Sequence, residues 1–150
     1  MPAKPPLFKQ ETGFSCAPAC LRMVLASLGI AKSEEELRKL SDCSKLLGTR
    51  AMSLVEAARK LGFLETGKFT LNLAELVMEV SSENWPIVYL RTQLFPGTKR
   101  QEHAVVVTRI DIDEVEALDP WRGELKLSLE EFQKEWLYPA GTSGLAILVR

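Results

Sequence analysis

The sequence predicts one α+β domain, in which a helical N-terminal half packs on an antiparallel C-terminal sheet. Apolar residues recur at three- and four-residue spacing through the first half, as on the buried face of a helix. Runs of β-branched residues separated by turn signals dominate the second half. The 150 residues are 46% hydrophobic, enough to bury one core. We therefore expect residues 1–150 to form a single domain, with residues 1–9 as an extended, proline-rich segment.

The first predicted helix begins at Cys16 and ends at Gly29. Ser15 occupies its N-cap position, and Pro18 is compatible with a first turn because a backbone N–H would have no helical partner there. Further helices are predicted at 33–41, 51–61, 72–81 and 128–136. Three of them open with capping-box spacing, namely Ser33 with Glu36, Asn72 with Glu75, and Ser128 with Glu131. This reading places Cys16 at a helix N-terminus.

Strands are predicted in the second half at 87–91, 103–110, 115–118 and 145–149. The first of them follows Pro86, which suits the opening position of a strand because proline cannot donate to the ladder. Residues 111–113 separate the second strand from the third and indicate a hairpin loop.

Charge and hydropathy exclude several classes of function. The net charge is −1 with interleaved signs, so neither a nucleic-acid partner nor a membrane surface is expected. The sequence contains no apolar run of about 18 residues that would span a membrane. Residues 1–9 lack the apolar core and cleavage site of a signal peptide. Because three cysteines are an odd number and a poor disulfide scaffold, we predict a reducing, cytoplasmic location.

One cysteine and one histidine form the candidate catalytic pair. A thiol becomes a strong nucleophile as the thiolate, which a helix N-terminus and a neighbouring imidazole both favour. Cys16 has the predicted helix N-terminus, and His103 is the only histidine in the chain. We expect Cys16 to act as the nucleophile and His103 as the general base.

A catalytic imidazole also needs a partner that orients its second ring nitrogen, and Asp119 is the best candidate. Asp119 follows the strand next to the one that His103 opens, sixteen residues on. In an antiparallel pair with a three-residue loop at 111–113, Val105 lies opposite Asp119, and His103 is the next residue on that face. A two-residue loop would put the pair on opposite faces, so the triad requires an odd loop or a bulge.

A tetrahedral intermediate needs hydrogen-bond donors for its oxyanion. The backbone N–H of Cys16 is one candidate. Gln10 lies six residues earlier, close enough for its side-chain amide to fold back over the sulfur as the second donor.

Several strings of the sequence resemble the peptidase C39-like family of papain-fold cysteine peptidases. The nucleophile helix carries QETGFSCAPACLRMVLASLG, and the histidine strand carries HAVVV. The connecting helix carries MSLVEAARKLGF, and the Asp-Pro segment carries DPWRGELKLSLEEFQKEW. The resemblance extends over roughly residues 7–150.

This resemblance implies a papain-like fold and a cofactor-free thiol peptidase acting on peptide or protein substrates. It assigns Cys16 as nucleophile, His103 as base, Asp119 as the group that orients His103, and Gln10 as an oxyanion donor. The family's best-known members are fused to bacteriocin and peptide-exporting ABC transporters and cut leader peptides after a Gly-Gly pair. Ala17-Pro18 replaces the glycine usual after their nucleophile, which changes local shape but removes no catalytic group.

Three alternatives stay open at the level of sequence. The same machinery can transfer an acyl group to an amine instead of to water. The domain can also be a non-catalytic peptide-binding or regulatory module on the same scaffold. Less favoured is a structural zinc site built from Cys16, Cys20, Cys43 and His103, because only the first two have a zinc-ligand spacing. In the peptidase interpretation Cys20 is a core residue and Cys43 is incidental.

Overall fold

The computed structural model describes residues 3–137 and 141–150 and has the predicted α+β class. In these residues the helices are α1 (Cys16–Ser27), α2 (Glu34–Leu40), α3 (Ala51–Lys60), α4 (Leu73–Ser81) and α5 (Leu129–Trp136). The strands are β1 (Gly67–Leu71), β2 (Ile87–Thr92), β3 (Gln101–Ile110), β4 (Glu114–Asp119), β5 (Gly123–Ser128) and β6 (Gly144–Leu148). They form one antiparallel sheet in the order β1-β6-β2-β3-β4-β5.

The two strands at the edges of this sheet were not predicted. β1 pairs only with β6, and β5 pairs only with β4. β1 is five residues long and lies between two helices, so its local pattern is weak and its pairing depends on a partner far along the chain. The N-terminal half is therefore not purely helical, since β1 separates α3 from α4.

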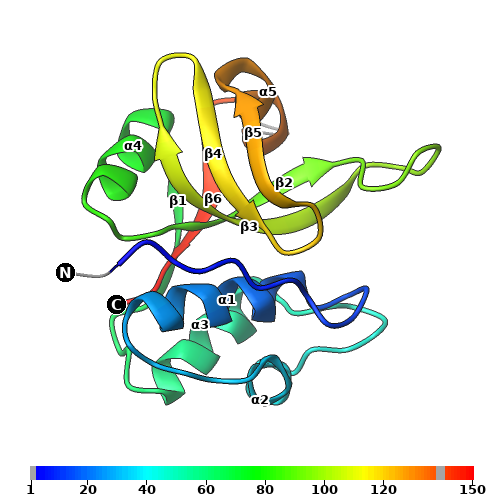
Figure 1. Cartoon of the computed structure of the whole chain (residues 1–150), viewed down its shortest axis with the longest axis vertical. Helices are drawn as coiled ribbons and strands as arrows, with labels where there is room; N and C mark the ends of the chain where they lie inside the picture. Colours follow the sequence, from blue (N-terminus) through cyan, green and yellow to red (C-terminus); the bar gives the residue numbers. More distant parts are fainter. Residues whose placement is uncertain (1–2, 138–140) are drawn as a thin grey trace.

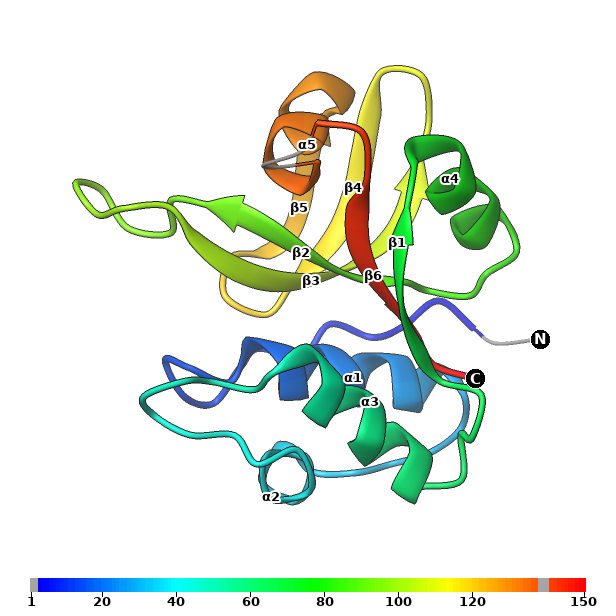
Figure 2. The ribbon, with the colours of Figure 1, turned by 180° about the vertical axis from the view of Figure 1, so that it is seen from behind.

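Helices cover both faces of the sheet (Figures 1 and 2). α1, α2 and α3 form a layer on one side, while α4 and α5 pack on the other. Alternate residues of β3 serve the two cores: Val106 packs with α1 and α3, whereas Val105 and Val107 pack with α4 and α5. Burial on both faces explains why this strand reads as a continuous apolar run.

The N-terminal segment lies between the helical layer and the sheet and ties them together (Figure 1). The Gln10 N–H donates to the Pro120 carbonyl at 2.8 Å, just beyond β4. On the other side, the Glu11 N–H donates to the Glu34 carboxylate of α2 at 2.9 Å. These two bonds fix the segment that precedes Cys16 relative to both halves of the molecule.

The start of α1 at Cys16, with Ser15 in the N-cap position, is as predicted. Ser15 is the N-cap residue, but its side chain makes no cap hydrogen bond to the helix. Its hydroxyl instead accepts from the Thr12 N–H at 3.2 Å and bonds the Thr12 hydroxyl at 2.7 Å. Ser15 thus closes the turn that leads into Cys16.

A bulge in β3 supplies the β3–β4 register that the predicted triad requires. The loop between β3 and β4 spans residues 111–113 as predicted, but Ile110 pairs with Val115, so four residues separate the two members of this pair. The register then shifts by one between Val107 and Arg109, where Thr108 is the extra residue. Val106 consequently pairs with Leu118, which is the register needed to bring His103 and Asp119 together.

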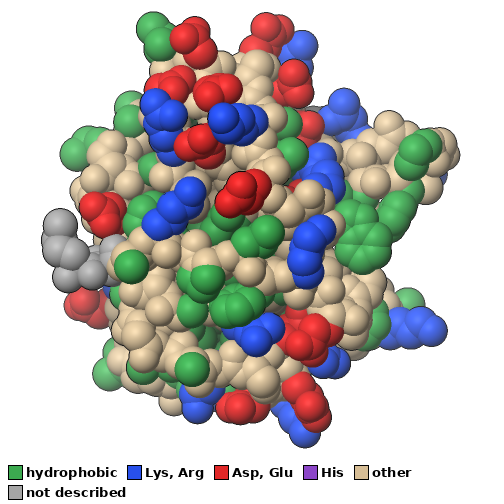
Figure 3. Space-filling model, in the orientation of Figure 1, with side chains coloured by type: hydrophobic (Ala, Val, Ile, Leu, Met, Phe, Trp, Pro, Cys, Tyr) green, Lys and Arg blue, Asp and Glu red, His purple; other side chains and the backbone are tan. Residues whose placement is uncertain are grey.

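Charges of both signs are mixed over the face shown in Figure 3, as the interleaved sequence predicted. Among the described residues, none of the helices has the length and apolar character needed to cross a membrane.

Candidate active site

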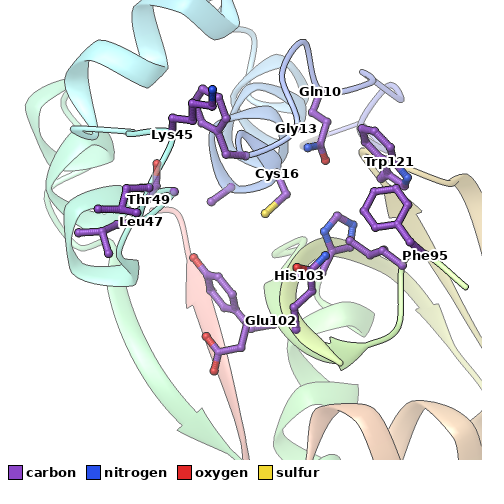
Figure 4. Close-up of a pocket in the computed structure, with 17 residues that line it drawn as sticks. Gln10, Gly13, Cys16, Lys45, Leu47, Thr49, Phe95, Glu102, His103 and Trp121 are labelled. Carbon is purple, nitrogen blue, oxygen red and sulfur yellow. The ribbon is translucent and has the colours of Figure 1, made fainter. Parts of the chain in front are cut away.

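Four predicted residues, Gln10, Cys16, His103 and Asp119, gather where the helical layer meets the sheet. Cys16 is the first residue of α1, His103 lies near the start of β3, and Asp119 is the last residue of β4. Gln10, Cys16 and His103 line a cleft of about 340 Å³ (Figure 4). Asp119 lies behind His103 and is fully buried.

His103 and Asp119 form a buried hydrogen-bonded pair. The His103 Nε2 lies 2.6 Å from the Asp119 Oδ1, and the two side chains are 2% and 0% exposed. The Cys16 side chain lies beside the same imidazole in the cleft and contributes to raising the pKa of His103. Since Nε2 faces the carboxylate, Nδ1 is the ring nitrogen left for the thiol. The three side chains thus follow one another in the order carboxylate, imidazole and thiol, with the first two hydrogen-bonded.

Asp119 is held by more donors than His103 alone. Its Oδ1 also accepts the backbone N–H groups of Trp121 and Arg122, at 2.7 and 3.0 Å. Its Oδ2 accepts the Arg122 Nε at 2.5 Å. The sequence analysis gave Arg122 no role, although it lies three residues after Asp119, where an Asp-initiated turn can bring it back. This set of donors compensates the burial of the carboxylate charge.

The two buried groups stabilise each other's charged form. Burial alone would lower the pKa of His103, but its hydrogen bonds to Asp119 and Cys16 and their negative charge outweigh burial and raise that pKa to about 9. Burial would raise the pKa of Asp119, but the hydrogen bond and charge of His103, with hydrogen bonds from Arg122, hold it well below its ordinary value. At neutral pH the pair is therefore an imidazolium beside a carboxylate.

The sulfur of Cys16 points into the cleft from the N-terminal end of α1 (Figure 4). Cys16 is half-buried, so a substrate can reach it. Backbone N–H groups of the first helical turn carry the positive end of the helix dipole, which favours a thiolate there. An anionic sulfur next to a charged imidazole is the ion pair that activates a thiol.

Gln10 reaches over the cleft with its side-chain amide toward Cys16 and His103 (Figure 4). Its Nε2 donates one hydrogen to the Thr12 carbonyl at 2.8 Å, which leaves the second hydrogen of that NH₂ group. Its Oε1 is buried and has no hydrogen-bond partner among the described residues. The amide is therefore fixed on one side and keeps bonding capacity on the other.

A buried ion pair anchors the turn that holds Gln10. Glu34 is fully buried at the start of α2, and its carboxylate accepts the Glu11 N–H. The Arg38 Nε lies 3.0 Å from the Glu34 Oε2, and Arg38 also contacts the Glu11 carboxylate at 3.2 Å. Glu34 opens the acidic run Glu34-Glu35-Glu36, and it is the buried residue of the three, whereas Glu35 and Glu36 are exposed. No local pattern marks one acid of a Glu run as the buried one.

The other cysteines do not join the site as ligands. Cys20 is fully buried in the core, as its position one turn after Cys16 predicted, and burial raises the pKa of its thiol. Cys43 is half-buried, with its sulfur 3.7 Å from the Phe14 carbonyl. Across residues 3–137 and 141–150, no three His, Cys, Asp or Glu side chains are placed to hold a metal ion. The four candidate zinc ligands are thus not gathered into one centre.

Tyr89 of β2 is a cleft residue that the sequence analysis missed. It lines the cleft beside Cys16, and its hydroxyl is buried without a hydrogen-bond partner in the described part of the chain. Burial, and then the charge of Cys16, raise the pKa of Tyr89 far above its usual value, so the phenol stays neutral. Tyr89 sits in an ordinary strand pattern, which carries no signal of its place in a cleft.

A sequence model of the Peptidase C39 family matches residues 4–144. The chain is also 28% identical over 130 residues to a lactococcin-G-processing and transport ATP-binding protein of Lactococcus lactis subsp. lactis. That match covers 85% of this chain, which spans only 17% of the length of the relative. The family predicted from the sequence motifs is thus confirmed.

Two solved structures share the fold. The peptidase domain of Streptococcus ComA, a bi-functional ABC transporter involved in a quorum sensing pathway, superposes with a TM-score of 0.72 at 28% identity, covering 97% of each chain. A double glycine motif protease from an AMS/PCAT transporter, solved in complex with the leader peptide, gives a TM-score of 0.70 at 22% identity. The second match covers 97% of this chain and 91% of that one and concerns the fold alone.

Proposed function

Since the chain belongs to the peptidase C39 family, we propose that it hydrolyses peptide bonds with a Cys16-His103-Asp119 triad. The observation that carries this proposal is the buried, hydrogen-bonded pair of His103 and Asp119, whose imidazole lines the same cleft as Cys16. Asp119 orients the imidazole and stabilises its charged form. The charged imidazole of His103 beside Cys16 is the kind of partner that activates a thiol for attack without a metal or a cofactor.

In the acylation step the Cys16 sulfur attacks the carbonyl carbon of the scissile bond. The carbonyl oxygen becomes an oxyanion, which accepts the Cys16 backbone N–H and the remaining hydrogen of the Gln10 Nε2. His103 donates the proton from its Nδ1 to the leaving nitrogen as the carbon–nitrogen bond breaks. The products of this step are a thioester on Cys16 and a free amine.

In the deacylation step neutral His103 takes a proton from water, whose oxygen attacks the thioester. The carbon–sulfur bond breaks, the acid leaves, and the thiolate–imidazolium pair is restored. An amine in place of water gives acyl transfer by the same sequence of bonds. The hydrogen-bond donors on Asp119 keep the carboxylate in place through both steps.

We assign peptides or proteins as the substrate class. The double glycine motif protease was solved with a leader peptide, and the Lactococcus relative is described as processing lactococcin G. An extended peptide fits an open cleft into which the thiol points. A reducing, cytoplasmic location agrees with three unpaired thiols, one of them the nucleophile.

Alkylation of the cysteines by iodoacetamide tests the triad without knowledge of the substrate. We expect Cys16 to react below pH 7 at a rate well above that of Cys43, because only Cys16 has an imidazole partner. His103→Ala should bring the rate at Cys16 down to that of an ordinary thiol. Peptide mapping by mass spectrometry assigns each modified cysteine.

A control uses Cys43 within the same molecule. Cys43 is half-buried like Cys16, and burial, with a smaller opposing effect of Thr49, raises the pKa of its thiol. If Cys16 and Cys43 react alike, with the pH profile of free thiols, the peptidase function is wrong. The domain then falls to the alternative of a non-catalytic peptide-binding module.

A further inference from the structure

Exposed apolar side chains gather around the cleft. In the described part of the chain eight large apolar residues are exposed, and four of them line the cleft: Leu46, Leu47, Phe95 and Trp121. Phe95 and Trp121 pack edge to face with ring centroids 5.4 Å apart, yet they remain 44% and 37% exposed. Two partly exposed aromatic rings beside the candidate nucleophile offer an apolar surface that can bind an apolar group.

The aromatic pair lies on a defined side of the nucleophile. Figure 4 shows Gln10, Trp121 and Phe95 on one side of Cys16, whereas Lys45 and Thr49 lie on the other. Trp121 is fixed there because its backbone N–H donates to the Asp119 oxygen that also holds His103. The pair is thus built onto the histidine side of the cleft.

The direction of a bound peptide follows from the four bonds of the tetrahedral carbon. One bond goes to the Cys16 sulfur, the oxyanion points to Gln10, and the leaving nitrogen must lie within reach of His103. The fourth substituent, the acyl-side Cα, is left to point toward the open side, where Lys45 and Thr49 lie. The segment that departs with the leaving nitrogen therefore passes over His103 toward the aromatic pair.

From this geometry we infer that Phe95 and Trp121 form the subsite for the first residue after the scissile bond, and that this subsite selects an apolar side chain. The inference rests on the proposed peptidase function and adds its leaving-side specificity. A cationic side chain is disfavoured, because the Lys9 ammonium already lies at the Trp121 carbonyl, 2.7 Å away. A glycine offers the rings nothing to bury.

Acyl-transfer partitioning tests this subsite independently of the natural substrate. The p-nitrophenyl ester of acetyl-glycyl-glycine acylates Cys16 and releases p-nitrophenolate, with no residue on the leaving side. Added amino acid amides then compete with water for the thioester: the amine nitrogen bonds to the acyl carbon, the carbon–sulfur bond breaks, and His103 accepts the amine proton. By microscopic reversibility, the capturing amine occupies the position of the leaving amine.

In the wild type we expect leucinamide to capture the acyl group about tenfold more efficiently than glycinamide, since a leucine side chain is partly buried on the rings. Lysinamide should capture no better than glycinamide. Phe95→Ala and Trp121→Ala should bring the leucinamide-to-glycinamide ratio toward one. Ile112→Ala, which removes an exposed apolar side chain that does not line the cleft, should leave that ratio unchanged.

The outcomes separate this inference from the function on which it rests. If the ester gives no Cys16-dependent burst of p-nitrophenolate, the peptidase function fails and the subsite with it. If the burst occurs but the wild type captures glycinamide and leucinamide equally, only the subsite is overturned. A preference for leucinamide that persists in both Phe95→Ala and Trp121→Ala also overturns it, because the selectivity then lies elsewhere.

Discussion

The replacement Asp119→Asn isolates the charge that supports His103. The change keeps the shape of the side chain and removes one negative charge from a fully buried position. The pKa of His103 stands at about 9 against an ordinary value of 6.5. That difference corresponds to about 3 kcal/mol in favour of the imidazolium, net of burial and shared between Asp119 and Cys16. Without the carboxylate, burial dominates, and we expect the pKa of His103 to fall to its ordinary value or below.

Nuclear magnetic resonance measures this pKa directly, because His103 is the only histidine in the chain. In untagged protein with ¹⁵N-labelled histidine, the wild-type ring should stay protonated to about pH 9. The Asp119→Asn ring should titrate at or below about pH 6.5. Cys16 alkylation at pH 6 should then slow, by up to about 100-fold if Asp119 supplies most of the roughly 3 kcal/mol that favours the imidazolium.

Two further variants make the experiment decisive. Asp113→Asn removes an exposed carboxylate from the hairpin loop and should leave both the histidine titration and the alkylation rate unchanged. Cys16→Ala separates the share of the thiolate from that of Asp119. If the Asp119→Asn ring titrates like that of the wild type, the carboxylate does not set the charge of His103, and the triad reasoning is refuted.

Three other predictions concern stability. Because the pKa of His103 is raised in the folded state, the contribution of this residue to stability is complete below about pH 6.5 and is lost as the pH rises through about 9. The free energy of unfolding measured in urea should therefore fall by up to about 3 kcal/mol over that window in the wild type but not in His103→Gln. Arg122→Met should lower the free energy of unfolding in urea by about 1.5–3 kcal/mol, since it removes a charged donor from buried Asp119. Arg109→Met on the exposed hairpin should lower it by less than about 1 kcal/mol. Equal losses would contradict the role of Arg122 as a donor that supports Asp119. Glu34→Ala should lower the free energy of unfolding by about 1–3 kcal/mol, because the Glu11 N–H loses its acceptor and Arg38 keeps only the Glu11 carboxylate. Exposed Glu35→Ala is the near-neutral control, and a Glu34→Ala protein as stable as the wild type would show that Glu34 does not anchor this turn.

The helices were the most predictable part of the fold, because their signals are local. Ser33 and Ser128 accept the N–H groups of Glu36 and Glu131, and Asn72 with Glu75 forms the full capping box. The edge strands were not predictable in the same way, since β1 and β5 depend on partners that only the folded sheet supplies. Local sequence signals thus predicted the helix starts to within one residue, whereas the pairing of strands far apart in the chain became known only from the structure.

The residues of the candidate site likewise fall into those that the sequence indicated and those that only the structure revealed. Cys16, His103 and Asp119 are residue types with a chemical role, so their order in the chain already indicated a site. Arg122 and Tyr89 gave no such signal, because an arginine after a turn and a tyrosine in a strand are common. Their places behind Asp119 and beside Cys16 arise from the turn after β4 and from the pairing of β2 with β3.

The bulge at Thr108 sets a rule for insertions and deletions in this hairpin. Four residues separate Ile110 from Val115, its partner in β4, and the one extra residue in β3 restores the face that His103 shares with Asp119. Deleting Thr108 alone would straighten the strand and turn the histidine away from its carboxylate. Shortening the loop by one residue in the same chain would turn it back. A change of one residue at a single place in this hairpin should therefore separate His103 from Asp119, whereas two such changes, one in the strand and one in the loop, should preserve their contact. Surface hairpins otherwise tolerate changes in length.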